Sequence, residues 1–376
     1  MKPVRTCTAL CMLAVASCRD SSGSRLSVLH PTPDNVVPDS KLACVIGDAA
    51  HVGERSALAV QARALAASRV VAVVGAANGD EAGTFGAVTA VAVDATGDVF
   101  VLDGARRQIR LVRAAGTAAG SVPAGAREAL SLKAPTQITI ASHGRIAVAD
   151  RDRLVRVYET LSPEVRGTTV RVPFVPTGVC AIDDELLVRG HRRDEGHVIH
   201  VYAMDGRHVR SFADGYRSPN WLVRHAMSEG LIGCSPSDRV VVSMFTFMPF
   251  VYGYSASGEL LWVSRIGDFL PRRVKEGVDS DNRPEVLADP RGTTDVAVKL
   301  TGLGNGYVLA QTLRTRSTGG ADEREVRSYL VEATTGRGVG IGTMLPIVLG
   351  ARLPRLYAVD PQQPFPRLIV LRVPGD

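Results

Sequence analysis

The sequence predicts an all-β fold, a six-bladed β-propeller that is closed by an N-terminal strand in its last blade. Two observations carry this prediction. A strand–turn–strand outline recurs at blade-sized intervals, and strand-like stretches follow one another from Arg69 almost to the last residue. Sheets repeated in this way bury a continuous core only against their neighbours, and a ring leaves only short, protected edges. We expect a signal peptide over 1–17, a tether or linker over 18–68 and the propeller over 69–376.

The clearest repeat unit is Ala90–Asp103, in which two apolar strands flank a glycine-containing turn and an aspartate closes the second strand. The same outline returns at Gln137–Asp150. A third apolar strand follows each copy, at Gln108–Val112 and at Leu154–Tyr158. Alternating and β-branched residues bounded by turn residues are typical of short antiparallel strands, so each copy reads as most of one blade.

Weaker copies extend the pattern along the chain. Second strands are expected to start near Val99, Ile146, Leu186, Val240, Tyr307 and Arg355. Their spacing of about 40 to 67 residues fits blades with insertions. The pattern is poorest over Leu270–Asp295 and in the inner strand of the last blade, near Pro346–Gly350.

The ring also needs a closing strand. The last copy ends at its third strand, whereas the apolar run Arg69–Val74 precedes the first copy. We therefore expect Arg69–Val74 to form the outer strand of the last blade, and we expect truncation at Gly75 to destabilise the ring. The alanine-rich stretch Glu54–Ser68 is compatible with one short helix.

The N-terminus is typical of an export signal. Lys2 and Arg5 precede the apolar stretch Thr8–Ala16, which is too short to cross a bilayer as a helix. The following order, Val-Ala-Ser and then Cys18, resembles the lipobox of bacterial lipoproteins, which implies lipidation of Cys18 and a place in the cell envelope, periplasmic or outer-membrane. The alternatives are an ordinary cleaved signal and an apolar start that arises by chance.

Composition narrows the choice of partners. Hydrophobic residues make up 45% and charged residues 22% of the chain, as in ordinary globular domains. Residues 1–17 hold two of the 44 basic residues, so the remainder exceeds the 38 acidic residues only slightly. Nucleic acid is therefore not expected as a partner. We expect a monomer that touches the membrane through its lipid anchor alone.

The repeats also resemble a known family. Val91–Asp103 and Ile138–Asp150 are similar to NHL-type repeats, found in six-bladed propellers that bacteria export. Gly79–Gly86 resembles the glycine-rich segment ahead of the first blade in such proteins. The resemblance implies a scaffold that serves diverse functions, and it does not imply one activity.

Known propeller enzymes need site residues that are scarce here. Lactonase-type propellers hold a metal with carboxylates and asparagines in the channel, and asparagine is rare on the expected inner strands. Lyase-type propellers need histidines from several blades, yet His143 and His191 belong to turns on opposite faces, and His197 and His200 lie by a third strand, away from the axis. No metal, cofactor or catalytic residue is therefore expected, and the glycine run Gly338–Gly342 reads as an outer strand.

Two pairs of residues occupy equivalent places in different blades. Cys180 and Cys234 each stand six residues before a second strand. They are either two small buried apolar residues or a disulfide between adjacent inner strands, which needs Cα atoms within about 7 Å. Asp103 and Asp150 are expected to hydrogen-bond the turn that follows their strand.

The most suggestive feature is a set of basic loops. Loops between second and third strands share one face of a propeller, and four of them carry basic residues: Arg106, Arg107, Arg151, Arg153, His191, Arg192, Arg193, Arg314 and Arg316. The fourth blade instead has an apolar loop with Phe245 and Phe247. Arginine binds carboxylate and phosphate groups in bidentate fashion. We interpret the protein as an envelope-anchored, non-enzymatic binding or assembly module for a protein or an anionic ligand; the alternative is a hydrolase or lyase with an unrecognised channel site.

Overall fold

The computed structural model describes residues 27–29, 42–47, 56–75, 85–112, 132–159, 167–272, 274–278, 284–288, 292–318, 321–359 and 366–375. The signal segment and Cys18 lie outside these residues. Among the described residues, no helix has both the length and the apolar character needed to cross a membrane.

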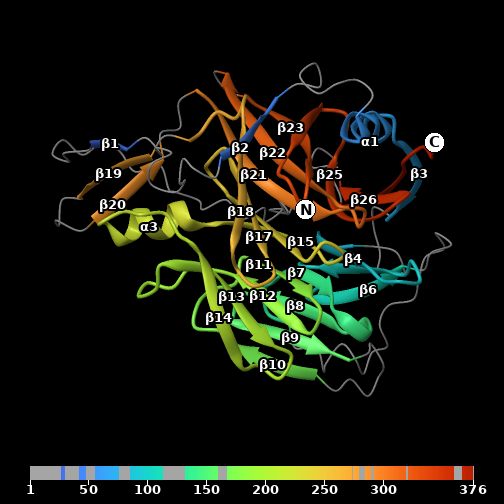
Figure 1. Cartoon of the computed structure of the whole chain (residues 1–376), viewed down its shortest axis with the longest axis horizontal. Coiled ribbons are helices and arrows are strands. Elements are labelled where there is room, and N and C mark those ends of the chain that lie inside the picture. Colours follow the sequence, from blue (N-terminus) through green and yellow to red (C-terminus); the bar gives the residue numbers. More distant parts are fainter. Residues whose placement is uncertain are drawn as a thin grey trace, which may run out of the picture.

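Six antiparallel sheets form a ring, which confirms the six-bladed β-propeller (Figure 1). The inner strands are β4 (Val88–Val93), β7 (Pro135–Ile140), β11 (Gly178–Ile182), β15 (Gly230–Ser235), β21 (Thr293–Gly302) and β25 (Ile347–Arg352). Each inner strand contacts the next one in this order, and β25 contacts β4. The circle of contacts is therefore complete, and no inner strand is left without a neighbour on either side.

The second strands start where the sequence places them, or within one residue: β5 (Val99–Asp103), β8 (Ile146–Asp150), β12 (Glu185–Arg189), β16 (Val240–Phe245), β22 (Tyr307–Thr318) and β26 (Arg355–Val359). The third strands are β6 (Gln108–Val112), β9 (Leu154–Tyr158), β13 (His197–Ala203), β17 (Phe250–Ser255), β23 (Ala321–Glu332) and β27 (Leu368–Arg372). The outer strands are β10 (Gly167–Arg171), β14 (His208–Asp214), β18 (Leu260–Ile266), β24 (Gly338–Gly342) and β3 (Arg69–Val74). The glycine run is thus an outer strand, as expected.

Closure of the ring follows the prediction. β3 pairs antiparallel with β27, with Val74 opposite Leu368 and Arg69 opposite Arg372. Chain from before the first blade therefore completes the last one. The two ends of the ring are joined by backbone hydrogen bonds along this strand pair, in addition to side-chain packing.

Two segments from the range expected to be a tether also pack on the ring. β2 (Leu42–Ile46) pairs in parallel with β18 and extends the fourth blade to five strands. α1 (Ala57–Ala66), the expected short helix, packs against β24 and β23. The folded part of the chain, as described, therefore begins well before Arg69.

The poorly patterned sector contains a small extra sheet. β19 (Val274–Val278) and β20 (Pro284–Ala288) form a hairpin, and β1 (Ser27–Leu29) pairs with β19. This sheet is inserted between the fourth and fifth blades and lies to the left of the ring in Figure 1. An insertion of this kind hides the repeat spacing, which explains why the sequence pattern weakens there.

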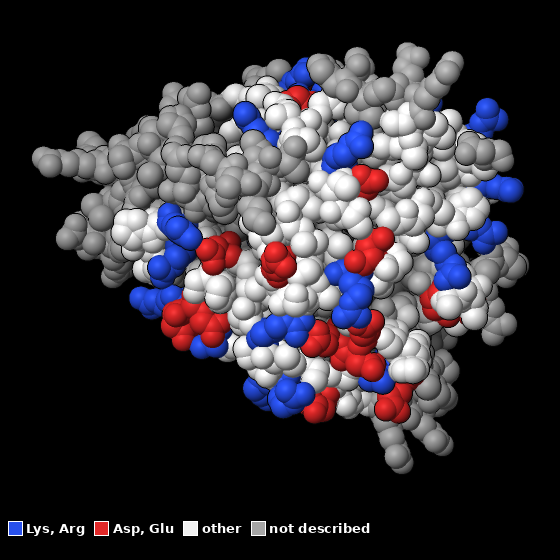
Figure 2. Space-filling view, viewed as in Figure 1, with Lys and Arg blue, Asp and Glu red and all other residues white. Residues whose placement is uncertain are grey.

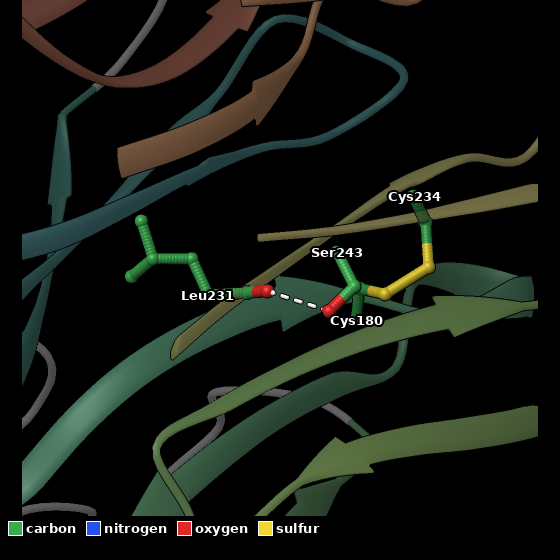
Figure 3. Close-up of a disulfide and its surroundings, with 4 residues drawn as sticks. All are labelled: Cys180, Leu231, Cys234 and Ser243. Carbon is green, nitrogen blue, oxygen red and sulfur yellow. Dashed lines mark hydrogen bonds between the residues drawn. A yellow bond between two sulfur atoms is a disulfide. The ribbon is translucent and has the colours of Figure 1, made fainter. Parts of the chain in front are cut away.

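The third and fourth blades are joined covalently. Cys180 and Cys234 form a disulfide between the adjacent inner strands β11 and β15, with Cα atoms 5.8 Å apart. Figure 3 shows the bond beside Ser243, whose hydroxyl donates to the carbonyl of Leu231 at 3.2 Å. Of the two alternatives that the sequence left open, the structure has the disulfide.

Candidate functional site

One face of the ring collects the loops between second and third strands together with the segments that lead into the inner strands. We call it the loop face. Asp103 ties these two kinds of segment together, because its buried carboxylate accepts hydrogen bonds from the backbone N–H of Gly86 at 2.8 Å, Ala87 at 3.0 Å and Arg106 at 3.0 Å. The bond to Arg106 lies in the turn that follows the strand, as the sequence analysis expects.

Asp150 repeats this arrangement in the second blade. Its carboxylate accepts from the backbone N–H groups of Lys133 and Ala134, both at 2.7 Å. These groups precede the inner strand, and Nε of Arg156, on the third strand, lies 3.8 Å from the same carboxylate. Both aspartates are fully buried, which makes them part of the frame beneath the loop face.

The basic residues of the first two blades lie on this face. Arg107, Arg151 and Arg153 are exposed, whereas Arg106 is half-buried with its Nε 4.0 Å from Asp103. Arg107 and Arg153 both have positive φ, at 55° and 66°, because each ends a tight turn. These turns aim arginine side chains outward from rigid strand ends.

In the third blade, one expected rim residue is neutralised locally. Arg192 forms ion pairs with Asp194 at 2.8 Å and with Glu195 at 2.6 Å, whereas Arg193 is exposed. His191 is half-buried, and its burial together with the nearby His225 lowers its pKa to about 4. Arg193 is therefore the residue of this loop that adds positive charge to the surface, since Arg192 is paired with carboxylates and His191 is neutral near pH 7.

In the fifth blade, the prediction that both arginines lie in a loop is wrong, although Arg316 is exposed. Arg314 and Arg316 lie within the long strand β22 and not in a loop. Arg314 is 8% exposed and makes a bidentate pair with the buried carboxylate of Asp295, at 2.8 and 2.7 Å. The charge of Arg314 is therefore neutralised inside the fold by a carboxylate that is itself buried.

The phenylalanines of the fourth-blade loop, which we expected at the surface, are mostly buried. Phe245 is 3% and Phe250 is 4% exposed, and both belong to the core between the third and fourth blades. Phe247 is half-buried against that core, with the Arg272 guanidinium 5.9 Å from its ring centre. The phenylalanines therefore fill the interior and do not form an aromatic patch at the surface.

A helix that the sequence analysis did not foresee covers this region instead. α3 (Trp221–Ser228) follows β14, and the side chain of Asn220 caps it by accepting from the N–H of Leu222 at 2.9 Å. In Figure 1 the helix lies beside β20, which it also contacts. An N-cap asparagine ahead of an amphipathic stretch was the available signal in the sequence.

α3 is docked on the loop of the third blade by three contacts. The Arg193 guanidinium lies 4.7 Å from the centre of the Trp221 ring. Arg224 donates to the carbonyl oxygen of Arg193 at 3.0 Å. The Nδ1 atoms of His225 and His191 are 3.4 Å apart. The helix and the loop therefore form one ordered surface.

Arg189 holds the other end of α3 from below. It is 1% exposed and donates to the hydroxyl of Ser243 at 2.6 Å and to the carbonyl of Ser228, in the last turn of the helix, at 3.1 Å. Its guanidinium also lies 5.0 Å from the Phe245 ring. A cation is stabilised at a helix C-terminus, although burial lowers the pKa of Arg189 to about 10.

A shallow pocket of about 460 Å³ opens beside the helix. Its lining residues are Gly196, Asp214, Gly215, Tyr216, Arg217, Ser218, Pro219 and Arg224. Asp214 pairs with Arg217 at 2.9 Å and lies 3.4 Å from His197. The pocket therefore offers both donors and an acceptor next to the exposed ring of Trp221.

Charge on the visible surface is mixed. Figure 2 shows basic and acidic side chains interleaved over the lower half of the view, without a continuous basic band on this side. Within the described ranges, no group of three or more His, Cys, Asp or Glu residues is arranged to hold a metal ion. His143 lies in a turn on the face opposite to His191, as the sequence analysis expects.

No family model and no curated protein matches the chain. Among solved structures, the chain is similar to a DUF4221 family member from Bacteroides vulgatus, with 8% identity, 81% of this chain and 97% of the other covered, and a TM-score of 0.47. It is also similar to the Cps50 (Swd1) β-propeller domain of Myceliophteria thermophila, with 11% identity, 82% and 100% coverage and a TM-score of 0.39. A streptogramin B lyase has 11% identity, 69% and 94% coverage and a TM-score of 0.38.

Proposed function

We propose that this protein is a non-enzymatic binding module of the bacterial cell envelope, which holds an acidic segment of a protein partner on its loop face. A propeller fold is consistent with a scaffold role. The observation that carries the proposal is the surface built by α3 and the third-blade loop, where exposed Arg193 stacks on the exposed ring of Trp221. Arginine and tryptophan are the residues that dominate binding energy at protein interfaces.

Charge and geometry support an acidic partner. Arg153 and Arg193 project from ordered turns and are exposed, so both guanidinium groups are available to carboxylates. Arg217 and Arg224 line the neighbouring pocket, where a short side chain of the partner would be held. Rim charges of this kind set the orientation and the rate of association more than the final affinity.

The proposed location rests on the N-terminal lipobox-like sequence, and the disulfide supports it. Cys180 and Cys234 are paired inside the ring. Disulfides form and persist in oxidising compartments such as the bacterial periplasm. We therefore propose that Cys18 carries a lipid that anchors the protein in the cell envelope.

A charge-reversal experiment tests the proposed surface. The variant Arg153→Glu/Arg193→Glu places two negative charges on the loop face. The control Arg207→Glu/Arg337→Glu makes the same change at exposed positions in turns on the opposite face. In a second pair of variants, a photo-crosslinking residue replaces Ser218 in the pocket or, as the control, Ser257 on the opposite face.

Cells that carry the Ser218 crosslinker should yield a defined crosslinked protein, identified by mass spectrometry. The loop-face charge reversal should lower its yield about tenfold, and the control should leave it unchanged. Equal crosslinking from Ser257, or equal yields for both charge reversals, would show that the loop face is not the binding surface.

A further inference from the structure

The centre of the ring holds a charged side chain that the loop face does not use. Lys299 lies on β21, the inner strand of the fifth blade, and is 7% exposed. Its Nζ donates a hydrogen bond to Oε1 of Gln137, at 3.1 Å, on the inner strand β7 of the second blade. The second and fifth blades stand opposite each other in a ring of six (Figure 1). This hydrogen bond therefore spans the central channel.

The ammonium group of Lys299 lacks a neutralising charge within the described part of the chain. Its one hydrogen-bond partner there is the neutral amide of Gln137, and no described carboxylate lies within ion-pair distance. Loss of water on burial lowers the pKa of Lys299 to about 8. A buried cation without a counter-charge is costly, so such a group attracts an anion.

The two other buried cations described above differ from Lys299. Arg314 is paired with the buried carboxylate of Asp295. Arg189 has the C-terminal carbonyl of α3 and the ring of Phe245. Arg189 thus has two oxygen acceptors and an aromatic ring, whereas Lys299 has one described acceptor, an amide oxygen, and is the least satisfied of these three cations.

Gln137 adds a second donor at the same place. Its Oε1 accepts from Lys299, so its Nε2–H₂ group remains as a donor on the same carboxamide. Val298, next to Lys299 in the chain, is partly buried against the apolar cluster that contains Val91 and Leu349. Two donors from opposite blades therefore converge at the buried end of the Lys299 side chain, where a charge-assisted hydrogen bond is strong.

We propose that the channel binds a small carboxylate ion, of the size of formate or acetate, between Lys299 and Gln137. One carboxylate oxygen accepts from Nζ and the other accepts from Nε2. A carboxylate fits because it presents two acceptor oxygens in one plane, one for each donor. The site is separate from the loop face and goes beyond the proposed function, so either can fail without the other.

Thermal unfolding in formate and in chloride, at matched ionic strength, tests this site. Formate should raise the Tm of the wild-type protein by about 2 to 5 °C more than chloride does, because a ligand that binds only the folded state stabilises it. Lys299→Met removes the charge at similar length and should abolish this difference. Lys133→Met, at a side chain that is 72% exposed, is the matched control and should keep it.

A second variant and a direct measurement make the result decisive. Gln137→Leu keeps the ammonium group and removes the amide donor, and it should weaken the formate effect without removing the response to salt. The NMR signal of ¹³C-formate should broaden with the wild-type protein and with Lys133→Met, and stay sharp with Lys299→Met. Equal Tm shifts in Lys299→Met and wild type, or a sharp signal with every protein, would overturn the proposal. A larger effect of phosphate than of formate would also overturn it, in favour of an inorganic oxyanion site.

Discussion

At the scale of single residues, the end of each second strand decides how the loop face is held together. Asp103 and Asp150 occupy this position in the first two blades and bind backbone N–H groups of the segments that lead into their own inner strands. In the third blade the position is Arg189, which reaches the last turn of α3 instead. The charge at this position matches the backbone group that it binds, because the carboxylates accept from N–H groups and the guanidinium donates to a carbonyl oxygen.

The substitution Asp150→Ala should destabilise the protein by about 2–4 kcal/mol, because it removes a buried carboxylate that accepts from the part-buried N–H groups of Lys133 and Ala134 and pairs with Arg156 at 3.8 Å. Asp184→Ala is the control, since the Asp184 side chain is 65% exposed and only forms a surface pair with Arg145. That change should cost about 0.5 kcal/mol or less. Denaturant unfolding measures both, and similar losses for the two variants would contradict the assigned role of Asp150.

At the scale of elements, the third and fourth blades are joined both by a covalent bond and by a shared core. Their inner strands are linked by the disulfide, and their shared core includes Phe245, Phe250 and Met227 of α3. The helix is therefore not a loose cover on the loop face. It is anchored by the core below it, by Arg189 and by the third-blade loop.

Removal of the disulfide by Cys180→Ala/Cys234→Ala should lower the free energy of unfolding by about 4 kcal/mol. The bond closes a loop of 54 residues, and a cross-link of that length restricts the unfolded chain by about this amount. Urea unfolding with and without reductant measures the effect. Reductant should destabilise the wild-type protein and leave the double variant unchanged; an equal response of both proteins would contradict a native disulfide.

At the scale of the whole molecule, stability depends on closure of the ring by chain from both ends. β3 pairs with β27 across the last blade. Leu58, Ala62 and Leu65 of α1 are buried in the core that the fifth and sixth blades share. The stability of the ring therefore depends on α1 and β3, which both precede the first repeat in the sequence.

A series of N-terminal truncations separates these contributions. A chain that begins at Ser56 loses β1 and β2, one that begins at Arg69 also loses α1, and one that begins at Gly75 loses β3 as well. Calorimetry should show a stepwise fall in Tm, with the largest step, of more than about 10 °C, at the loss of β3, because β3 closes the ring whereas β2 adds a fifth strand to a blade that already has four. A Gly75 start with unchanged Tm would refute closure by β3.

Local patterns in the sequence were sufficient for the ring itself. The strand alternation, the turn glycines and the repeated aspartate predict the second strands and the closing strand, because each of these depends on residues close together in the chain. The same reasoning placed Cys180 and Cys234 at equivalent positions. It left their pairing open, since a disulfide depends on the distance between two strands that are far apart in sequence.

Tertiary structure alone decided which side chains face solvent and which meet across the ring. Arg314 and Phe245 read as loop residues in the sequence, yet both are buried, because strand length and the packing of adjacent blades determine burial. Lys299 and Gln137 are 162 positions apart and carry no local signal. Closure of the six blades brings these two side chains together, because the inner strands of opposite blades face each other across the centre of the ring.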